Sequence, residues 1–241
     1  MTSLIILGLL AGAYIALAGS GSKMVAYHLL ANPETYGLGR CLAGVIFPTG
    51  LMLVVLAGAE LFTGNVMMLL PLYQRRITLT SMLRNWIVVY AANFAGALLV
   101  AFLIYQSGQL KVGDGMLREV YVKVATAKCS LTFVEALTLG ILCNWLVCLA
   151  VWMSIGAKDT TGKILAIFFP IWLFNAAGLE HSIANMYFIA VALFAAHSPW
   201  MGTEALTWQN FLVVHLFPVT LGNLIGGGVF VALAYGVVNR E

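Results

Sequence analysis

The chain has 241 residues, of which 62% are hydrophobic and only 9% are charged, and its formal net charge is +3. Soluble domains contain about 45–50% apolar and about 25% charged residues, so this composition excludes a soluble enzyme and a disordered chain. A surplus of three cations is too small for a surface that binds nucleic acid. The composition predicts an integral membrane protein surrounded by lipid.

Six uncharged runs are long enough to cross a membrane, since a helical span needs roughly 20 apolar residues. They cover residues 1–22, 41–59, 85–110, 136–157, 181–203 and 205–239. The first run lacks the basic segment of a signal peptide, because the first cation is Lys23, so we expect it to be retained as a span. The sequence therefore predicts an all-α membrane protein with six transmembrane helices.

The second and fifth spans are predicted to be broken. Two shorter runs, 61–74 and 164–179, adjoin them across Glu60 and Glu180. Unbroken helices over the joined stretches would be about 50 Å long, whereas the hydrocarbon layer is about 30 Å thick. Each stretch also has glycines, a carboxylate and other polar groups at its centre. Unwound backbone at membrane depth is tolerated only where it packs in protein or lines a wet cavity, so we expect a break at the midplane of each span.

The two halves of the chain resemble each other. The interruptions at residues 60–65 and 180–185 share the pattern E-x4-N, and a second pattern pairs residues 85–90 with 210–215 and residues 93–96 with 223–226. We predict a single transmembrane domain over 1–241, with a first three-helix repeat at 1–108 and a second, inverted three-helix repeat at 124–239.

The cations give a weak orientation. If Lys23 and Lys128 belong to spans, six Lys and Arg residues lie on the side of the termini and four on the other side. The positive-inside rule then favours a multi-pass protein of the cytoplasmic (inner) membrane with both termini in the cytoplasm.

The second half-helices are expected to begin near residues 63–65 and 182–185, with Thr63 and Ser182 as N-caps. Helix N-termini carry partial positive charge, so two that converge at the midplane favour a small monovalent anion. Such a path requires no cofactor. The four cysteines have no metal-binding spacing, so we expect no metal site.

His181 is the only histidine in a predicted break, and two interpretations are open. It either donates a hydrogen bond or a proton to the permeating species, which we favour, or is a packed histidine with satisfied hydrogen bonds. His28, His197 and His215 are expected to have structural or interfacial roles.

Other charged residues near the breaks also allow two interpretations. Glu60 and Glu180 either relay protons or, with Asn65 and Asn185, brace the loops; bracing is favoured because a bare carboxylate would repel an anion. Lys128, at the expected start of the fourth span, either attracts anions into an outer vestibule or snorkels to the interface. Glu135 is expected to pair with Lys128.

Large apolar residues cluster around the two breaks and predict dry constrictions on either side of His181, although ordinary packing of the helix bundle explains any one of them. They are Phe47, Leu51, Leu61, Phe62 and Phe174.

Three segments together resemble the signatures of the formate/nitrite transporter family, and the resemblance covers nearly the whole chain. The segments are Glu60-Leu-Phe-Thr-Gly-Asn65, Leu142-Cys-Asn-Trp-Leu-Val-Cys-Leu-Ala-Val-Trp152 and Gly178-Leu-Glu-His-Ser-Ile-Ala-Asn-Met186. The resemblance implies an aquaporin-like protomer in a homopentamer that passes formate, nitrite, hydrosulfide or short carboxylates such as acetate and lactate, and no enzymatic activity.

The resemblance also implies roles for individual residues. Thr63 matches the loop threonine of the family, His181 its central histidine, Lys128 its vestibule lysine and Asn144 a pore-lining asparagine. Matches to the outer constriction are Phe47, Leu51 and Phe174, and matches to the inner constriction are Leu61 and Phe62.

These expectations combine into a proton-coupled channel. A bare anion enters a dry slit at high cost, and the proposed substrates are conjugate bases of weak acids, so one proton removes most of that cost. His181 would supply the proton or relay it from water. Two alternatives stay open, namely a neutral-solute channel for water or ammonia and an intramembrane redox protein with histidine-bound haem.

Overall fold

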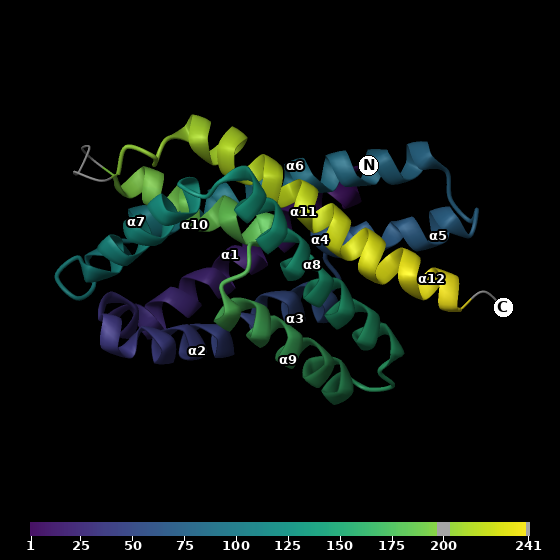
Figure 1. The fold of residues 1–241 in the computed structure, drawn as a ribbon, viewed down its shortest axis with the longest axis horizontal. Coiled ribbons are helices and arrows are strands. Elements are labelled where there is room, and N and C mark those ends of the chain that lie inside the picture. Colours follow the sequence, from purple (N-terminus) through teal and green to yellow (C-terminus); the bar gives the residue numbers. More distant parts are fainter. Residues whose placement is uncertain (197–202, 240–241) are drawn as a thin grey trace.

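The computed structural model describes residues 1–196 and 203–239, and within these it is all-helical, with six helical stretches long and apolar enough to span a membrane. The helices, in chain order, are α1 (Thr2–Ala31), η1 (Pro33–Thr35), α2 (Tyr36–Ile46), α3 (Pro48–Ala57), α4 (Phe62–Asn65), η2 (Val66–Met68), α5 (Leu69–Tyr73), α6 (Leu79–Gln106), η3 (Gln109–Lys111), α7 (Met116–Cys129), α8 (Phe133–Gly156), α9 (Thr160–Ala177), α10 (Ser182–Ala195), η4 (Asn210–Leu216), α11 (Phe217–Gly227), η5 (Gly228–Leu233) and α12 (Ala234–Val238). The start of α1 and the end of α12 lie towards the same end of the molecule (Figure 1). His197 and Arg240 lie outside the described residues.

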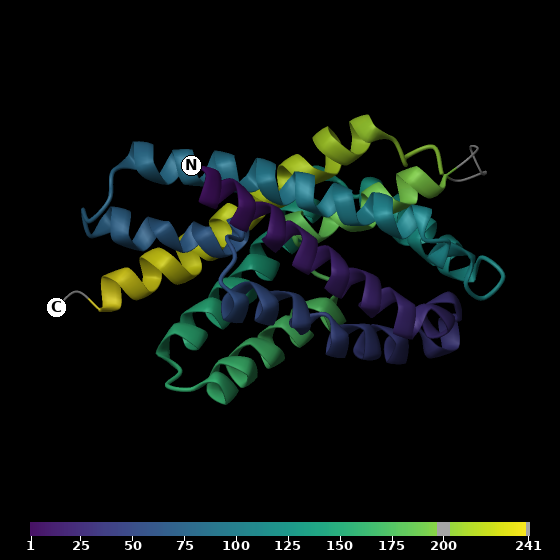
Figure 2. The same ribbon diagram turned by 180° about the vertical axis from the view of Figure 1, so that it is seen from behind.

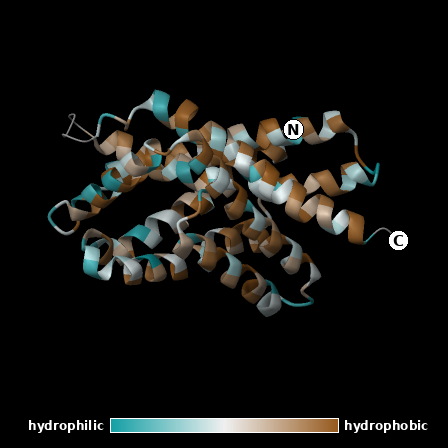
Figure 3. Cartoon of the chain, in the orientation of Figure 1, coloured by the Kyte–Doolittle hydropathy of each residue, from teal (hydrophilic) through white to brown (hydrophobic). Residues whose placement is uncertain are grey.

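The outer surface of the bundle is apolar, as contact with lipid requires. Hydrophobic colour runs along the helices, and hydrophilic colour is concentrated at their ends and in the loops (Figure 3). Ile87, Ile155 and Val213 are each more than 60% exposed. A soluble monomer rarely exposes so much contiguous apolar surface.

Two closely packed helix pairs form the frame, α1 with α6 and α8 with α11. From behind, α1 crosses over α6 (Figure 2). A Cβ on Gly96 of α6 would collide with the carbonyl of Leu9, and a Cβ on Gly226 of α11 would collide with the carbonyl of Ile141. Small residues allow helix backbones to approach this closely in membranes. The same contact thus recurs in each half of the chain.

The two predicted breaks are confirmed. Helix α3 ends at Ala57, Gly58 has φ +78°, and the chain turns helical again at Phe62. Helix α9 ends at Ala177, Gly178 has φ +80°, and α10 begins at Ser182. A positive φ is strained for residues with a Cβ, so glycine at these two positions ends each helix without that strain.

The expected N-caps are wrong by one or two residues. Leu61 and His181 precede the two half-helices, and Thr63 and Ser182 lie within the first turns. The His181 Nδ1 accepts a hydrogen bond from the Ala184 backbone N–H at 3.1 Å, which is the bond that a Ser or Thr cap would have supplied. The Nδ1 lone pair of the histidine ring thus takes the place of the hydroxyl oxygen of a Ser or Thr cap.

Asn93 of α6 braces the first break. Its Oδ1 accepts from the Phe62 backbone N–H at 2.9 Å, and its Nδ2 donates to the carbonyls of Gly8 and Glu60 at 2.7 and 2.9 Å. This buried amide satisfies backbone groups that the missing helical turn leaves unpaired.

Asn223 of α11 braces the second break in the same way. Its Oδ1 accepts from the Ser182 backbone N–H at 2.9 Å, and its Nδ2 donates to the carbonyls of Gly140 and Glu180, both at 2.9 Å. These matched bonds are what a duplication produces, and the repeat boundaries at 1–108 and 124–239 stay a prediction.

One part of the expected duplication has a different register. Asn85 was paired with Asn210, but eight residues separate Asn85 from Asn93 and the same eight separate His215 from Asn223. His215 is therefore the counterpart of Asn85, whereas Asn210 donates to the Ala205 carbonyl near the start of the sixth span. The matched hydrogen bonds therefore pair Asn85 with His215, not with Asn210 as the similarity of residues 85–90 to 210–215 suggested.

A short helix separates the halves and changes the expected place of Lys128. Lys128 lies in the last turn of α7, before the fourth span rather than at its start. Thr132 then caps α8 in a reciprocal arrangement with Glu135, whose carboxylate accepts from the Thr132 backbone N–H at 2.8 Å. The expected pair between Lys128 and Glu135 is therefore wrong, because a helix terminus lies between them.

Candidate functional site

A cationic vestibule leads from the surface to the second break. We use this name for a cavity of about 240 Å³ whose lining includes Lys23, Arg40, Lys128, Glu180 and His181. Tyr36 also lines it and is 43% exposed, so the cavity reaches the surface. Three cations and one buried carboxylate line this cavity, and this excess of positive charge attracts anions.

Beyond the vestibule lies a much smaller apolar void of about 10 Å³, enough for about one water molecule. Phe47, Phe174 and His181 line both the vestibule and the void. The Phe47 and Phe174 rings meet edge to face with centroids 5.5 Å apart, so they form a narrow point between the two spaces.

The remaining constriction candidates divide into two groups. Leu51 and Leu61 line the small void together with His181. Phe62 packs edge to face on Tyr90 of α6 with centroids 4.8 Å apart, and it lines neither of these two cavities. The structure thus gathers four of the five apolar candidates at the void.

The two breaks meet through His181 and Thr63. His181 Nε2 and Thr63 Oγ1 are 2.8 Å apart, and both side chains are at most 3% exposed. Because Nδ1 accepts from Ala184, a neutral His181 carries its proton on Nε2, which therefore donates to the Thr63 oxygen. The Thr63 hydroxyl, which accepts this bond through its oxygen, can still donate its own hydrogen to another acceptor.

Asn144 supports this contact from behind. Its Nδ2 donates to the carbonyls of Thr63 and Asn223 at 3.2 and 2.7 Å. The Cys148 thiol also donates to the Thr63 carbonyl, at 3.3 Å. Asn144 is fully buried and lines neither cavity, so its observed contacts hold the two breaks in register.

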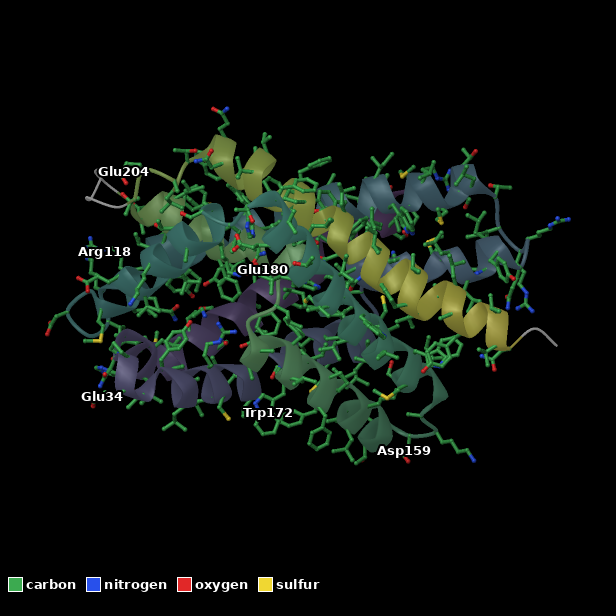
Figure 4. All side chains as sticks on the ribbon, in the orientation of Figure 1. Glu34, Arg118, Asp159, Trp172, Glu180 and Glu204 are labelled. Atoms are coloured by element: carbon green, nitrogen blue, oxygen red, sulfur yellow. The ribbon has the colours of Figure 1, made fainter. Side chains whose placement is uncertain are left out.

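Glu180 is the centre of a buried polar cluster and lies in the middle of the molecule, whereas Glu34, Arg118 and Asp159 lie at its periphery (Figure 4). Its Oε2 accepts from the Lys128 Nζ at 2.6 Å and from the Asn185 Nδ2 at 2.7 Å. The ion pair gives each buried charge its counter-charge.

Glu60 and Asn65 repeat part of this cluster in the first half. The Asn65 Nδ2 donates to the Glu60 Oε2 at 2.6 Å and to the Asn85 Oδ1 at 2.8 Å. Each carboxylate therefore ties the start of its break to the following half-helix. The two glutamates differ in their charged neighbours. Within the described residues, the Glu180 carboxylate has the Lys128 ammonium nitrogen within 4.0 Å, and the Glu60 carboxylate has no cation at that distance.

Sequence reasoning missed three members of the site. Lys23 is 8% exposed and its Nζ lies 5.0 Å from the centroid of the Phe188 ring, a cation–π contact. Arg40 donates to the Asn175 carbonyl at the end of α9. His215 contacts Asn185 and lies near Glu180. Lys23 was detectable, since it directly follows the first uncharged run of 22 residues.

Across residues 1–196 and 203–239, no three or more His, Cys, Asp and Glu side chains lie close enough together to hold a metal ion.

Comparisons with known proteins match this architecture. The family model described as formate/nitrite transporter matches residues 1–237. The chain belongs to this family. The protein is therefore a multi-pass membrane protein of a family of anion channels and transporters, which are not enzymes.

Several similar proteins are named formate channels. The chain is 42% identical to formate channel BtFdhC of Bacillus thuringiensis, over 98% of this chain and 86% of the relative. It is 36% identical to formate channel FocA of Escherichia coli (strain K12), over 96% of this chain and 85% of that protein. A solved pentameric formate channel with formate bound has a TM-score of 0.86 at 32% identity, covering 99% of this chain and 97% of the other.

Proposed function

We propose that the protein carries small monovalent anions of weak acids across the cytoplasmic membrane together with a proton, and that formate is one of its substrates. The observation that carries the proposal is the His181–Thr63 contact, which lies between a cationic vestibule and an apolar void of about 10 Å³. Similarity to formate channels supports formate, and nitrite, hydrosulfide, acetate and lactate share its single charge and small size.

The vestibule performs the first step. Lys23, Arg40 and Lys128 provide more positive charge than the Glu180 carboxylate neutralises, so an anion is concentrated there. The apolar void beyond has no room for the hydration shell of an ion, and a bare charge is too costly to bury. The anion must therefore lose its charge before it proceeds.

His181 and Thr63 act on the anion at this point. Burial near Lys128 disfavours an imidazolium, but an arriving anion supplies the opposite charge that stabilises it. The imidazolium forms when Nδ1 takes up a proton, which breaks the hydrogen bond from the Ala184 N–H. It then gives its Nε2 proton to the anion, the neutral acid passes the void, and a proton from water in the vestibule returns to Nε2. Thr63 holds the ring and offers its hydroxyl hydrogen to the passing oxygen atom.

The assembly and orientation are part of the same proposal. The protein forms a homopentamer in which each protomer has its own path, supported by the similarity to a pentameric channel. Both termini lie in the cytoplasm, on the side with more Lys and Arg residues. Native mass spectrometry in detergent counts the protomers, and a C-terminal reporter active only in the cytoplasm tests the orientation.

Proteoliposomes containing a pH-sensitive dye test the transport function. An inward gradient of formate should acidify the lumen faster than in protein-free liposomes, and nitrite, hydrosulfide, acetate or lactate should compete. Formate flux that charges the membrane without acidifying the lumen rejects proton coupling. Water or ammonia flux without formate flux supports the neutral-solute channel instead.

A further inference from the structure

His215 occupies the position in the second half that Asn85 occupies in the first. Asn85 accepts from the Asn65 Nδ2 at 2.8 Å, and His215 Nε2 lies 2.8 Å from the Asn185 Nδ2. In both halves the asparagine amide also donates to the glutamate at the start of the break. The chain thus has a titratable ring where the equivalent position has an amide that carries no charge.

The geometry fixes the protonation state of His215 in this structure. The Asn185 Nδ2 faces the Glu180 carboxylate at 2.7 Å, so this atom is the amide nitrogen and donates. The same nitrogen faces the His215 Nε2, which must therefore accept through its lone pair. His215 is neutral, with its proton on Nδ1.

A second proton on His215 would rearrange the cluster. It would bind at Nε2 and point a hydrogen at the Asn185 amide, so the bond between them would break. The nearest available acceptor is the Glu180 Oε2, which lies 3.5 Å from Nε2 and already accepts from Lys128 at 2.6 Å. One carboxylate would then be shared between two cations.

Few other charged groups compete for the ring. His215 is fully buried in η4, a π-helical segment that packs against α7, α8, α10 and α11. These helices and the break before α10 carry the titratable side chains Arg118, Glu119, Tyr121, Lys123, Lys128, Cys129, Glu135, Cys143, Cys148, Glu180, His181 and Tyr187. Helix α11 carries none. Of the charged groups, Glu180 lies 3.5 Å from the ring and Lys128 is paired with Glu180.

We propose that His215 is a proton switch for the cationic vestibule, set by its position beside Glu180 and Asn185. With His215 neutral, the carboxylate is committed to Lys128, and the three side chains have a net charge of zero. When His215 takes up a proton, its Nε2–H donates to the Glu180 carboxylate and weakens the Lys128–Glu180 pair. The Lys128 ammonium can then bind an anion, and the net charge of the three side chains becomes +1. His215 is a positioning residue, since it acts through Glu180 and does not touch the permeating species.

The switch rests on the proposed anion transport but is distinct from proton transfer at His181. It changes how strongly the vestibule binds an anion at acid pH and leaves the number of protons carried per anion unchanged. A change in anion affinity therefore reports the His215 switch, and a change in the number of protons per anion reports proton transfer at His181.

The first half of the chain supplies the matched variant, His215→Asn. An asparagine oxygen can accept from Asn185 as Asn85 accepts from Asn65, but it takes up no proton. His215→Gln, with a longer side chain, is the second variant if His215→Asn does not fold. Initial formate influx into proteoliposomes is measured at pH 5.5 and 8.0 over a range of formate concentrations.

For the wild type, the half-saturating formate concentration should fall about tenfold from pH 8.0 to pH 5.5, because one added charge raises the local anion concentration by about that factor. At pH 8.0 the His215→Asn variant should have the half-saturating formate concentration of the wild type. Its half-saturating concentration should change little between pH 8.0 and pH 5.5, and its ratio of protons to formate should be unchanged. A variant that folds and keeps the wild-type fall overturns the switch. A loss of luminal acidification in the wild type overturns proton coupling and leaves the affinity comparison to decide the switch.

Discussion

Thr63 and His181 lie 118 residues apart in the chain, yet the threonine Oγ1 is 2.8 Å from the histidine Nε2. One residue comes from each broken span, so their hydrogen bond joins the two halves of the fold beside the small apolar void that His181 lines. The contact depends on the interruption of both helices. Each half-helix begins at its break, and the unpaired backbone groups there are satisfied by other partners.

Thr63→Ala should slow formate influx several-fold while Thr63→Ser keeps most of it. The alanine removes one hydrogen bond to a buried ring, which is worth about 0.5–1.5 kcal/mol or about a factor of 2–13 in rate. The serine retains the hydroxyl. Influx is measured in proteoliposomes at equal protein content, and equal rates for the alanine and serine variants would make the hydroxyl incidental.

His181→Phe should abolish acidification that accompanies formate influx, because phenylalanine fills the same space without a proton to exchange. His28→Phe is the matched control, since His28 is exposed at the end of α1 and should transport normally. Luminal pH and radiolabelled formate are recorded together. An unchanged ratio of protons to formate in His181→Phe would contradict the donor role.

The spans and breaks were predictable because they depend on local sequence. A membrane penalises each charge, so uncharged runs mark the spans, and the glycine and carboxylate within residues 58–65 and 175–185 mark the interruptions. His181 and Thr63 were found for the same reason, since both are polar side chains within the interrupted stretches, His181 directly after Glu180 and Thr63 three residues after Glu60. The exact caps were missed for two reasons. At the second break a histidine ring replaces the usual short polar side chain, and at the first break the N-cap is Leu61 and an amide from α6 accepts the Phe62 N–H instead.

The polar cluster was less predictable because its members meet only through tertiary packing. Lys128 and Glu180 are 52 residues apart, and no spacing rule indicates their ion pair. The spacing rule that favoured Glu135 instead failed where one helix ends and the next begins. His215 was given a structural role because it lies inside the sixth span and not in a break, and its contacts with Asn185 and Glu180 arise only from the packing of η4.

Lys128→Met should destabilise the protein by about 3–5 kcal/mol, because the buried Glu180 carboxylate loses its counter-charge. The double variant Lys128→Met/Glu180→Gln should recover most of that stability and still transport formate more slowly than the wild type. Lys23 and Arg40 keep the vestibule positive, so the remaining loss reports the Lys128 ammonium as a direct partner of the anion. Thermal unfolding of the detergent-solubilised protein gives the first comparison and proteoliposome influx the second. Normal transport by a stable double variant would remove Lys128 from the anion path.

Asn93→Leu and Asn223→Leu should destabilise the protein by similar amounts, about 1–3 kcal/mol for each buried backbone N–H left unpaired. The similarity follows from the matched bonds that each amide makes to its break. Asn239→Ala is the control, since Asn239 is exposed at the end of α12 and should change stability by less than about 0.5 kcal/mol. A large difference between the Asn93 and Asn223 variants in thermal unfolding would mean that the two braces are not equivalent.

Gly96→Ala and Gly226→Ala should each weaken one helix pair, because the added Cβ meets a backbone carbonyl that cannot move aside. Overpacking of this kind costs about 1–3 kcal/mol, more than the gain of up to about 1 kcal/mol in helix propensity. At Gly37, where a Cβ meets open space, the same substitution should leave thermal stability equal or slightly raised. Since Gly96 and Gly226 hold the helices that carry Asn93 and Asn223, both variants should also lower formate influx. Unaltered unfolding temperatures for both would show that the helices can separate without disturbing the breaks.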